Sequence, residues 1–392
     1  MNLQLSTRVQ SIKPSPTLAV TNRAAELRAA GQDIIGLGAG EPDFDTPQYI
    51  KDAATAAIKN GFTKYTAVDG TPQLKNAIIN KFKNDNGLDY QANQILVSCG
   101  GKQSFFNLSL ALLNPGDEVV IPAPYWVSYP DMVKMAEGIP VVIDTNAAAR
   151  FKITAQQLDN AITPKTKLVV LNSPSNPSGM AYTKAELSEL GAVLRKYPDV
   201  LVATDDMYEH ILWTTEEFNN ILTVNPDLYD RTIVLNGVSK AYSMTGWRIG
   251  YAAGPQPLIA AMKKIQSQST SNPTSISQVA AQAALEGDQQ CVRDMVKVFK
   301  QRHDYMVKAL NEIDGIECLA GDGTFYVFPD FSGMQTKLNC KTDTDLAEKL
   351  LEAGVALVPG SAFGTPGHMR ISFATSDENL QKAAELLKVA SA

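Results

Sequence analysis

The chain has 392 residues, of which 44% are hydrophobic and 19% charged, and its formal net charge is −6. A globular chain of this length has room for roughly two or three domains. The acidic balance argues against nucleic acid or an anionic membrane as a partner, and no apolar run approaches the roughly 20 residues of a membrane span. The N-terminus has no apolar signal core, so we expect a cytoplasmic protein.

The sulfur and imidazole groups give no indication of a metal or disulfide framework. The four cysteines show no paired spacing, which predicts reduced thiols. The three histidines are too dispersed along the chain to predict a metal site. The residues concerned are Cys99, Cys291, Cys318 and Cys340, with His210, His303 and His368.

The predicted elements begin with a helix over residues 20–31, which ends at Gly31. From about residue 48 to residue 270, apolar strand patterns alternate with helical patterns, which predicts βαβ units and a parallel sheet. The predicted strands are 95–100, 117–123, 140–145, 167–173, 200–206, 232–238 and 248–254. The predicted helices between them are 102–113, 126–136 and 183–197.

The remaining chain has a different pattern. Helical spacing continues near residues 277–312, and short strands at 324–330, 355–360 and 369–374 then alternate with helices. This pattern indicates a smaller α+β domain built from both chain ends. We therefore expect residues 1–47 to form an N-terminal arm and part of the small domain. We expect residues 48–280 to form the large domain and residues 281–392 to complete the small domain.

Polar and aromatic residues gather where the predicted strands end. In an open parallel sheet, ligands bind beyond the carboxyl ends of the strands. These ends carry Gly100-Gly101-Lys102, Trp126, Asn172 through Asn176, Asp205 with Tyr208, and Ser239-Lys240. Taken singly, the paired glycines could be a tight turn and the aspartate a helix cap. Their convergence on one edge favours a binding site.

Lys240 lies between two apolar strands, where a cation is costly unless the site needs it. One interpretation is a serine hydrolase, because Gly237-Val238-Ser239 resembles the start of a nucleophile elbow and His303 or His368 could serve as base. Ala241 replaces the last glycine of that motif, which makes this a remote alternative.

A second interpretation uses the whole set of strand ends. A lysine that forms an imine, a carboxylate for a pyridinium nitrogen, a phosphate cup and a stacking ring are the parts that pyridoxal phosphate requires. Lys240, Asp205, the Gly100-Gly101 pair and Trp126 supply one of each.

Several blocks of the sequence together resemble a known family. Over nearly its whole length it is similar to the class I (fold type I) aminotransferases, and most closely to the bacterial branch of aspartate aminotransferases. The blocks that carry the resemblance are KPSPT (13–17), AGEPDFDTP (39–47), TKYTAVDGTPQLK with Tyr65, GGKQ (100–103), PYWVSYPDM (124–132), NSPSNPSG (172–179), DDMYEH (205–210), SKAYSMTGWRIG (239–250) and GHMRISFA (367–374).

The resemblance implies a role for each matching residue toward pyridoxal 5′-phosphate. Lys240 forms the internal aldimine and moves the proton, and Asp205 pairs with the pyridine nitrogen. Tyr208 and Asn176 bind the ring hydroxyl oxygen, and Trp126 stacks on the ring. The residues implied to hold the phosphate are Gly101, Lys102 through its backbone, and Arg248, with Tyr65 contributed by the partner subunit. Gly100 and Ser239 are further cofactor-binding candidates.

The resemblance also implies substrate contacts. Arg370 grips the α-carboxylate in a bidentate pair, with Gly40 closing over it. Two features of animal-type enzymes are missing, because Gly237 replaces a phosphate-binding serine and residues 266–275 contain no arginine for the distal carboxylate. Lys102 takes that task in the bacterial branch, where Lys13 is linked to accepting prephenate. The implied substrate contacts are thus Gly40, Lys102, Trp126, Asn176, Arg370 and Lys13.

The resemblance implies fold type I of the pyridoxal-phosphate-dependent transferases. Residues 48–280 would then be the cofactor-binding domain, with a mostly parallel central sheet flanked by helices, beside a smaller α+β domain. We expect a homodimer with shared active sites that converts L-aspartate and 2-oxoglutarate to oxaloacetate and L-glutamate by ping-pong kinetics. The same chemistry on prephenate or arogenate, on aromatic amino acids or on alanine is the nearest alternative.

Overall fold

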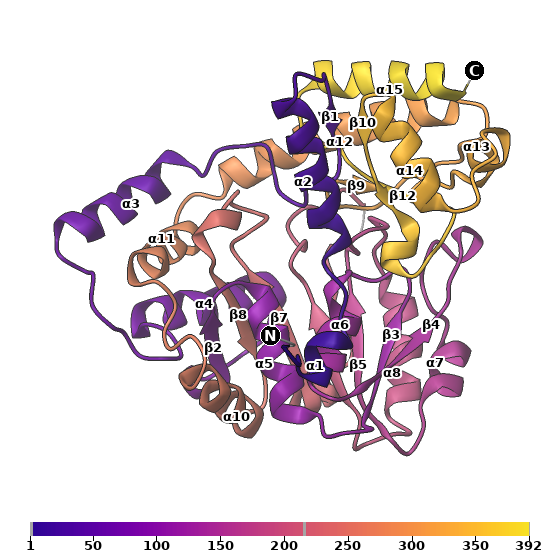
Figure 1. Cartoon of the computed structure of the whole chain (residues 1–392). Helices are drawn as coiled ribbons and strands as arrows, with labels where there is room; N and C mark the ends of the chain where they lie inside the picture. Colours follow the sequence, from indigo (N-terminus) through magenta and orange to yellow (C-terminus); the bar gives the residue numbers. More distant parts are fainter. Residues whose placement is uncertain (1–2, 215–216, 392) are drawn as a thin grey trace.

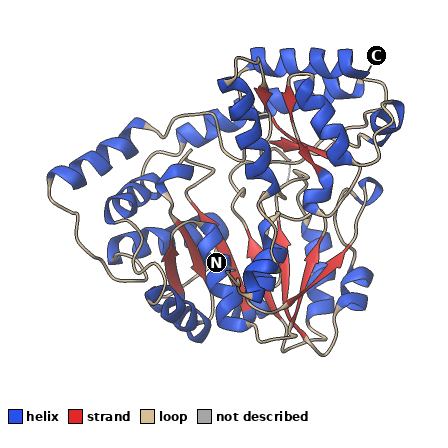
Figure 2. Cartoon of the chain, in the orientation of Figure 1, coloured by secondary structure: helices blue, strands red, loops and turns tan. Residues whose placement is uncertain are grey.

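The computed structural model describes residues 3–214 and 217–391, arranged in two units (Figures 1 and 2). Within the described residues, seven strands form the sheet of the larger unit in the order β2-β8-β7-β6-β5-β3-β4. These strands are β2 (Ile95–Ser98), β3 (Glu118–Pro122), β4 (Ile139–Ile143), β5 (Thr166–Asn172), β6 (Leu201–Asp205), β7 (Thr232–Gly237) and β8 (Gly250–Ala253). Each overlaps a strand predicted from the sequence.

Helices cover this sheet. The inner strands are buried beneath them, which explains the near-continuous apolar runs of these strands. The helices are α3 (Gln48–Lys59), α4 (Pro72–Asn86), α5 (Gly101–Leu112), α6 (Ser128–Met135), α7 (Ala155–Ala161), α8 (Lys184–Leu194), α9 (Ile221–Val224), α10 (Gln256–Ser267) and α11 (Ser275–Glu286). The short helix α1 (Thr7–Gln10) lies against α6.

The sheet is mostly parallel, as predicted, with one exception. β8 runs antiparallel to both of its neighbours, β2 and β7. The reason is the connection from β7 to β8, residues 238–249, which holds no α-helix that could carry the chain back across the sheet. A short connection of this kind joins antiparallel strands, because a parallel pair needs a crossover.

The smaller unit, at the top of Figure 1, is built from both ends of the chain. β1 (Ile35–Gly36) pairs with β10 (Val355–Ala356), and a second sheet has the order β11-β12-β9. Its further elements are β9 (Tyr326–Val327), β11 (Val358–Pro359), β12 (Met369–Ser372), α2 (Pro16–Ala29), α12 (Gln290–Asn311), α13 (Ser332–Lys337), α14 (Asp343–Glu352) and α15 (Asp377–Ser391).

Two predicted elements of this unit differ from the structure. The predicted helix 20–31 begins earlier, at Pro16, because a proline fits the first helical position, where its missing N–H has no partner to lose. The predicted strand 355–360 divides into β10 and β11, since residues 355–356 pair with β1 while residues 358–359 pair with β12.

The cores of the two units meet along α12. Val292 of this helix packs in the core that contains β2, β7 and β8, whereas Phe299 and Met306 pack in the core of the smaller unit. The domain boundaries at residues 47/48 and 280/281 therefore stay a proposal. No helix in the described parts of the chain is long and apolar enough to cross a membrane.

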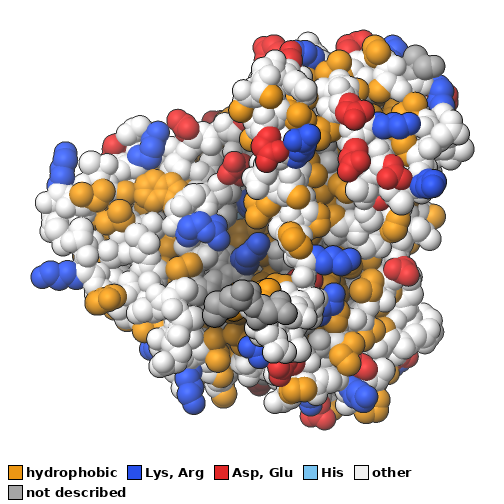
Figure 3. All heavy atoms as spheres, in the orientation of Figure 1, with side chains coloured by type: hydrophobic (Ala, Val, Ile, Leu, Met, Phe, Trp, Pro, Cys, Tyr) orange, Lys and Arg blue, Asp and Glu red, His pale blue; other side chains and the backbone are white. Residues whose placement is uncertain are grey.

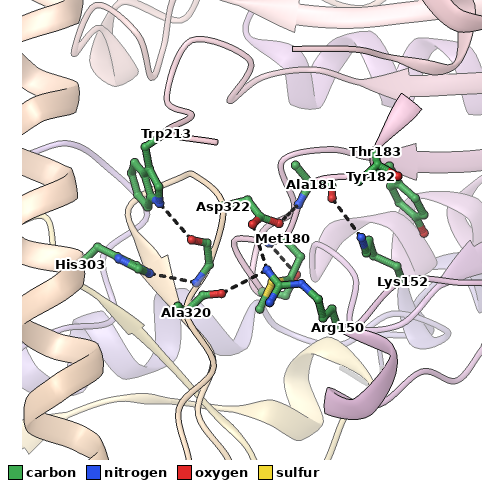
Figure 4. Close-up of polar contacts among 12 residues, drawn as sticks. Arg150, Lys152, Met180, Ala181, Tyr182, Thr183, Trp213, His303, Ala320 and Asp322 are labelled. Carbon is green, nitrogen blue, oxygen red and sulfur yellow. Dashed lines mark hydrogen bonds and ion pairs between the residues drawn. The ribbon is translucent and has the colours of Figure 1, made fainter. Parts of the chain in front are cut away.

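A polar junction also ties the two units together (Figure 4). Asp322 accepts hydrogen bonds from the Arg150 guanidinium and from the backbone N–H of Ala181, both at 2.9 Å. The backbone of Gly321 is held on both sides, because Trp213 donates to its carbonyl oxygen and His303 Nε2 accepts its N–H. This junction fixes the smaller unit against residues 172–181, the segment that carries Asn176.

Candidate active site

A cavity of about 450 Å³ lies at the carboxyl ends of the central strands and reaches the smaller unit. Most of the residues proposed from the sequence line it. They are Gly40, Gly101, Lys102, Trp126, Asn176, Asp205, Tyr208, Ser239, Lys240, Arg248 and Arg370. Four of these side chains are cationic, and Figure 3 shows several basic side chains near the junction of the two units. The cavity is suited to an anionic ligand.

Lys240 follows β7 and points into this cavity. Its Nζ donates a 2.5 Å hydrogen bond to the carbonyl oxygen of Gly40. Burial, and then the positive charge of Arg370, lower the pKa of the amine to about 8. A lysine with this pKa holds an appreciable neutral fraction near neutral pH, so it can act as a nucleophile or a base.

Asp205 ends β6 and is joined to α6 through Tyr129. The Tyr129 hydroxyl donates to one carboxylate oxygen, and the backbone N–H of Met207 donates to the other at 3.3 Å. Burial raises the pKa of Asp205 above its ordinary range, while these two donors and the charge of Lys240 oppose the rise. A cationic group of a ligand in the cavity would stabilise the charged form of this carboxylate.

Arg370 comes from β12 in the smaller unit and meets the larger unit inside the cavity. Its Nη1 donates to Asn176 Oδ1 at 3.0 Å and its Nη2 donates to the carbonyl oxygen of Gly38 at 2.7 Å. Its Nε has no hydrogen-bond partner in the described chain, although the side chain is buried. A buried guanidinium bonded only to neutral acceptors can receive a carboxylate.

Asn172 holds the two neighbouring site residues in place. Its Oδ1 accepts the backbone N–H of Asn176 at 2.8 Å, and its Nδ2 donates to the backbone oxygen of Asp205 at 2.9 Å. The ends of β5 and β6 are thus joined at the cavity, which fixes Asn176 relative to Asp205.

The N-terminus of α5 forms a cup beside Arg248. Gly100 precedes the helix with a φ of +86°, and a β-carbon there would lie 2.3 Å from the Arg248 guanidinium. The same guanidinium donates to the carbonyl oxygens of Thr245 and Cys99. Only glycine allows this close approach, which sets a cation next to free backbone N–H groups, the arrangement that binds phosphate.

Lys102 and Trp126 line the wall next to this cup. The Lys102 amine lies 5.3 Å from the centre of the Trp126 ring. Burial, and then the nearby Arg248 charge, lower the pKa of this lysine. No carboxylate of the described residues forms an ion pair with it, so its charge is free to bind an anion entering the cavity.

Three residues proposed from the sequence lie outside the cavity wall. Gly100 contributes only through the backbone beside Arg248. Tyr65 lies on the loop between α3 and α4 with 91% of its surface exposed. Lys13 is exposed and lines two neighbouring cavities, one of which also contains Lys102. Within one chain, Tyr65 is not brought together with the other site residues, and Lys13 shares only the neighbouring cavity with Lys102 and Arg248.

The serine hydrolase alternative finds no support in the geometry. Ser239 is buried at the cavity wall, but neither candidate histidine is hydrogen-bonded to it. His303 bonds to Asp304 and Gly321, and His368 bonds to the backbone oxygen of Pro366. Neither His303 nor His368 is therefore in position to act as a base for Ser239.

Sequence reasoning missed two residues of the site. Tyr129 stands three residues after Trp126, and in the predicted helix 126–136 this spacing would put both on one side. In the structure α6 begins only at Ser128, and Tyr129 contacts Asp205 from it. Tyr326 lies in the predicted strand 324–330, where residues 325–328 are all buried, so no alternation could have singled it out. It lines the cavity between Tyr208 and Arg370.

Comparisons with known proteins agree on one family. Residues 32–387 match the family described as aminotransferase class I and II. The chain is 62% identical over 390 residues to the aspartate/prephenate aminotransferase of Nitrosomonas europaea, covering 98% of each chain. It is 55% identical over 385 residues to the enzyme of that name from Cereibacter sphaeroides, covering 97% of this chain and 96% of the relative.

Solved structures give the same result. The aspartate aminotransferase from Rhizobium meliloti superposes with a TM-score of 0.96 at 49% identity, covering 100% of this chain and 99% of that one. The Thermus thermophilus aspartate aminotransferase with maleate gives a TM-score of 0.93 at 43% identity, covering 99% and 100%. The type I fold expected from the resemblance is confirmed.

Proposed function

This chain belongs to the class I and II aminotransferase family, and from that premise we propose that it transfers the amino group of L-aspartate to 2-oxoglutarate. The products are oxaloacetate and L-glutamate, formed in two half-reactions by ping-pong kinetics. The observation that carries the proposal is Lys240, an amine with a pKa of about 8 in a cavity that also holds Asp205 and Arg370.

We propose pyridoxal 5′-phosphate as the cofactor, because the residues present fit each part of it. When bound, it supplies an electron-withdrawing ring that stabilises negative charge at the α-carbon of the substrate. The Gly100 cradle and Arg248 suit its phosphate, and the buried carboxylate of Asp205 suits a protonated ring nitrogen. Tyr208 and Asn176 suit the ring hydroxyl oxygen, and Trp126 suits the ring face.

Lys240 has two tasks in this proposal. Its amine would be the group that holds the cofactor covalently, and it would give way to the amino group of the substrate. The free amine then accepts the proton of the substrate's α-carbon at Nζ and later returns a proton. Its pKa of about 8 leaves a neutral fraction large enough for both tasks.

The two carboxylates of aspartate meet two different cations. Arg370 binds the α-carboxylate through its fork of N–H groups, with Asn176 fixing the orientation of the guanidinium. Lys102 binds the distal carboxylate, since its charge has no anionic partner in the described chain. Gly40, whose carbonyl oxygen accepts from Lys240, closes the cavity on the substrate side.

The partner subunit completes the site in this proposal. Tyr65 is almost fully exposed, as expected of a side chain that a homodimer buries in the phosphate site of the partner. Ser239 lines the same cavity and stays a proposed cofactor contact. The cytoplasmic location expected from the sequence remains part of the same proposal.

Prephenate is a second candidate substrate. The relatives from Nitrosomonas europaea and Cereibacter sphaeroides are both named for aspartate and prephenate. Lys102 can bind the distal carboxylate of either compound, and Lys13 lines a cavity that shares Lys102. Arogenate, the product of that reaction, would then be formed in place of glutamate. Aromatic amino acids and alanine lack the distal carboxylate that Lys102 would bind.

The experiment is a coupled assay of the purified protein with L-aspartate and 2-oxoglutarate, with and without added pyridoxal phosphate. We expect oxaloacetate to form only with cofactor present, and prephenate to replace 2-oxoglutarate as acceptor if the second candidate holds. Hydrolysis of an ester by the cofactor-free protein, with no transamination, would overturn the proposal and favour Ser239.

A further inference from the structure

Tyr326 is a fully buried tyrosine of the cavity to which neither the sequence nor the resemblance gave a task. It lies on β9, where it pairs with Ser372 of β12, two residues from Arg370. Its side chain reaches out of the smaller unit and meets Tyr208, which belongs to the larger one. Tyr326 therefore touches two residues of the proposed site with two different parts of its side chain.

The ring of Tyr326 covers the guanidinium of Arg370. The central carbon of the guanidinium lies 4.5 Å from the centre of this ring and 5.1 Å from the centre of the Phe363 ring. Arg370 is only 2% exposed, and within the described residues no carboxylate forms an ion pair with it. A buried cation of this kind is costly, and the negative faces of aromatic rings offset part of that cost. The two rings also restrict the directions in which the fork can point.

The hydroxyl group of Tyr326 lies 3.1 Å from the hydroxyl group of Tyr208. This is the hydrogen bond that the structure gives the Tyr208 hydroxyl within the described chain. When Tyr326 donates, the Tyr208 oxygen is satisfied and its own proton is free to point into the cavity. A β-carbon on Gly40 would lie 3.2 Å from the same Tyr326 oxygen, so Gly40 leaves that hydroxyl room.

We propose that Tyr326 is a positioning residue with two separable tasks. Its ring orients Arg370 for the α-carboxylate of the substrate, and its hydroxyl group orients the hydroxyl proton of Tyr208 toward the cofactor. This inference rests on the proposed function and deepens it. It makes one side chain responsible for the orientation of two site groups, the Arg370 guanidinium and the Tyr208 hydroxyl.

Two substitutions separate the tasks, and a third serves as the matched control. Tyr326→Phe keeps the ring over Arg370 and removes only the hydroxyl group. Tyr326→Leu removes both. Phe363→Leu removes the other ring from Arg370 and leaves the Tyr208 contact intact. Each variant is loaded with pyridoxal phosphate, and its fold is checked by circular dichroism.

The first measurement is the binding of maleate, a dicarboxylate, by calorimetry. We expect Tyr326→Phe to bind it about as tightly as the wild type, and Tyr326→Leu to bind it about tenfold more weakly or worse. Phe363→Leu should also weaken the binding of maleate. Wild-type affinity in Tyr326→Leu would overturn the task assigned to the ring.

The second measurement is the pH at which the visible absorbance of the loaded protein changes. Loss of the Tyr326 donor makes Tyr208 a weaker donor, which leaves more negative charge on the cofactor's ring oxygen. We expect the midpoint to move up by about half a pH unit in Tyr326→Phe. The midpoint should not change in Phe363→Leu. An unmoved midpoint in Tyr326→Phe would overturn the task assigned to the hydroxyl group.

The outcomes also distinguish this inference from the proposed function. A wild type that transaminates aspartate while both Tyr326 variants match it in both measurements overturns the inference alone. A wild type that takes up no pyridoxal phosphate overturns the proposed function, and the inference with it.

Discussion

The Arg370 guanidinium donates a 3.0 Å hydrogen bond to the side-chain oxygen of Asn176, and this bond joins the two units of the chain across the cavity. Arg370 belongs to β12 of the smaller unit, whereas Asn176 follows β5 of the large sheet. A ligand carboxylate that binds this pair touches both units at once. Substrate binding in the proposed reaction would therefore draw the units together and exclude water.

This geometry predicts the effect of Arg370→Lys. The lysine keeps the charge but loses the planar fork and the bond to Gly38. We expect kcat/KM for L-aspartate to fall about 100-fold or more, because a bidentate pair becomes a single contact. Steady-state kinetics give this number, and cofactor content measured by absorbance serves as the control, since it should not change. Wild-type kcat/KM in the variant would contradict the assignment.

Lys102→Ala tests which substrate group the second cation binds. We expect kcat/KM for L-aspartate to fall about tenfold to 100-fold, the cost of losing one hydrogen bond to a charged group. L-alanine, which lacks the distal carboxylate, should lose little. The two substrates are compared in the same half-reaction. Equal losses would instead place the lysine side chain in the phosphate cup.

The pKa of Lys240 predicts a pH dependence for cofactor attachment. Only the neutral amine attacks, so the rate at which cofactor-free protein takes up pyridoxal phosphate should rise with pH and level off above about 8. Arg370 is the second cause of the lowered pKa. In Arg370→Ala the plateau should therefore move to higher pH, with the titrations of the free cofactor unchanged as an internal control. Stopped-flow absorbance measures both profiles, and identical profiles would contradict the electrostatic account.

Asp206, next to Asp205, predicts a pH dependence of stability. Burial, and then the charge of Glu209, raise the pKa of its carboxyl to about 8. The native state keeps this proton up to that pH, whereas the unfolded chain releases it near pH 4. The native state thus binds more protons between these values, so the contribution is complete below about pH 4 and is lost as pH rises toward 8.

Asp206→Asn removes this titration. The free energy of unfolding of the wild type should fall relative to the variant by about 1.4 kcal/mol per pH unit between about pH 5 and pH 8. Urea unfolding at several pH values measures the difference. The variant also disturbs the hydrogen bonds that Asp206 accepts from Thr204 and Asn220. This lowers its free energy of unfolding by an amount that does not vary with pH. A constant difference between the two proteins would show that Asp206 is ionised in the native state.

The sequence predicted the larger unit well for a physical reason. Its strands are buried on both faces, so each appears as a continuous apolar run, and the polar residues that follow these runs mark the cavity edge. Lys240, Asp205 and Asn176 were proposed in this way, and all three line the cavity. The antiparallel direction of β8 was not found, because residues 238–249 show no pattern that tells a crossover from a reversal.

Sequence patterns could not predict which distant segments of the chain contact one another. Tyr326 sits on a two-residue strand, too short for alternation to show which face is buried. Its neighbours Tyr208 and Arg370 lie more than 40 residues away on other elements, so only the folded chain brings them together. Tyr65 and Lys13 remain predictions, since their proposed tasks depend on a second subunit or on a bound substrate.

The most direct test of the account is to find where the cofactor attaches. The protein is loaded with pyridoxal phosphate, reduced with borohydride, digested and analysed by mass spectrometry. We predict one reduced pyridoxyl group, on the peptide that contains Lys240, and its loss from that peptide when L-aspartate is added before reduction. A label on another lysine, or a label on Lys240 that aspartate leaves unchanged, would contradict the central claim that Lys240 carries and releases the cofactor.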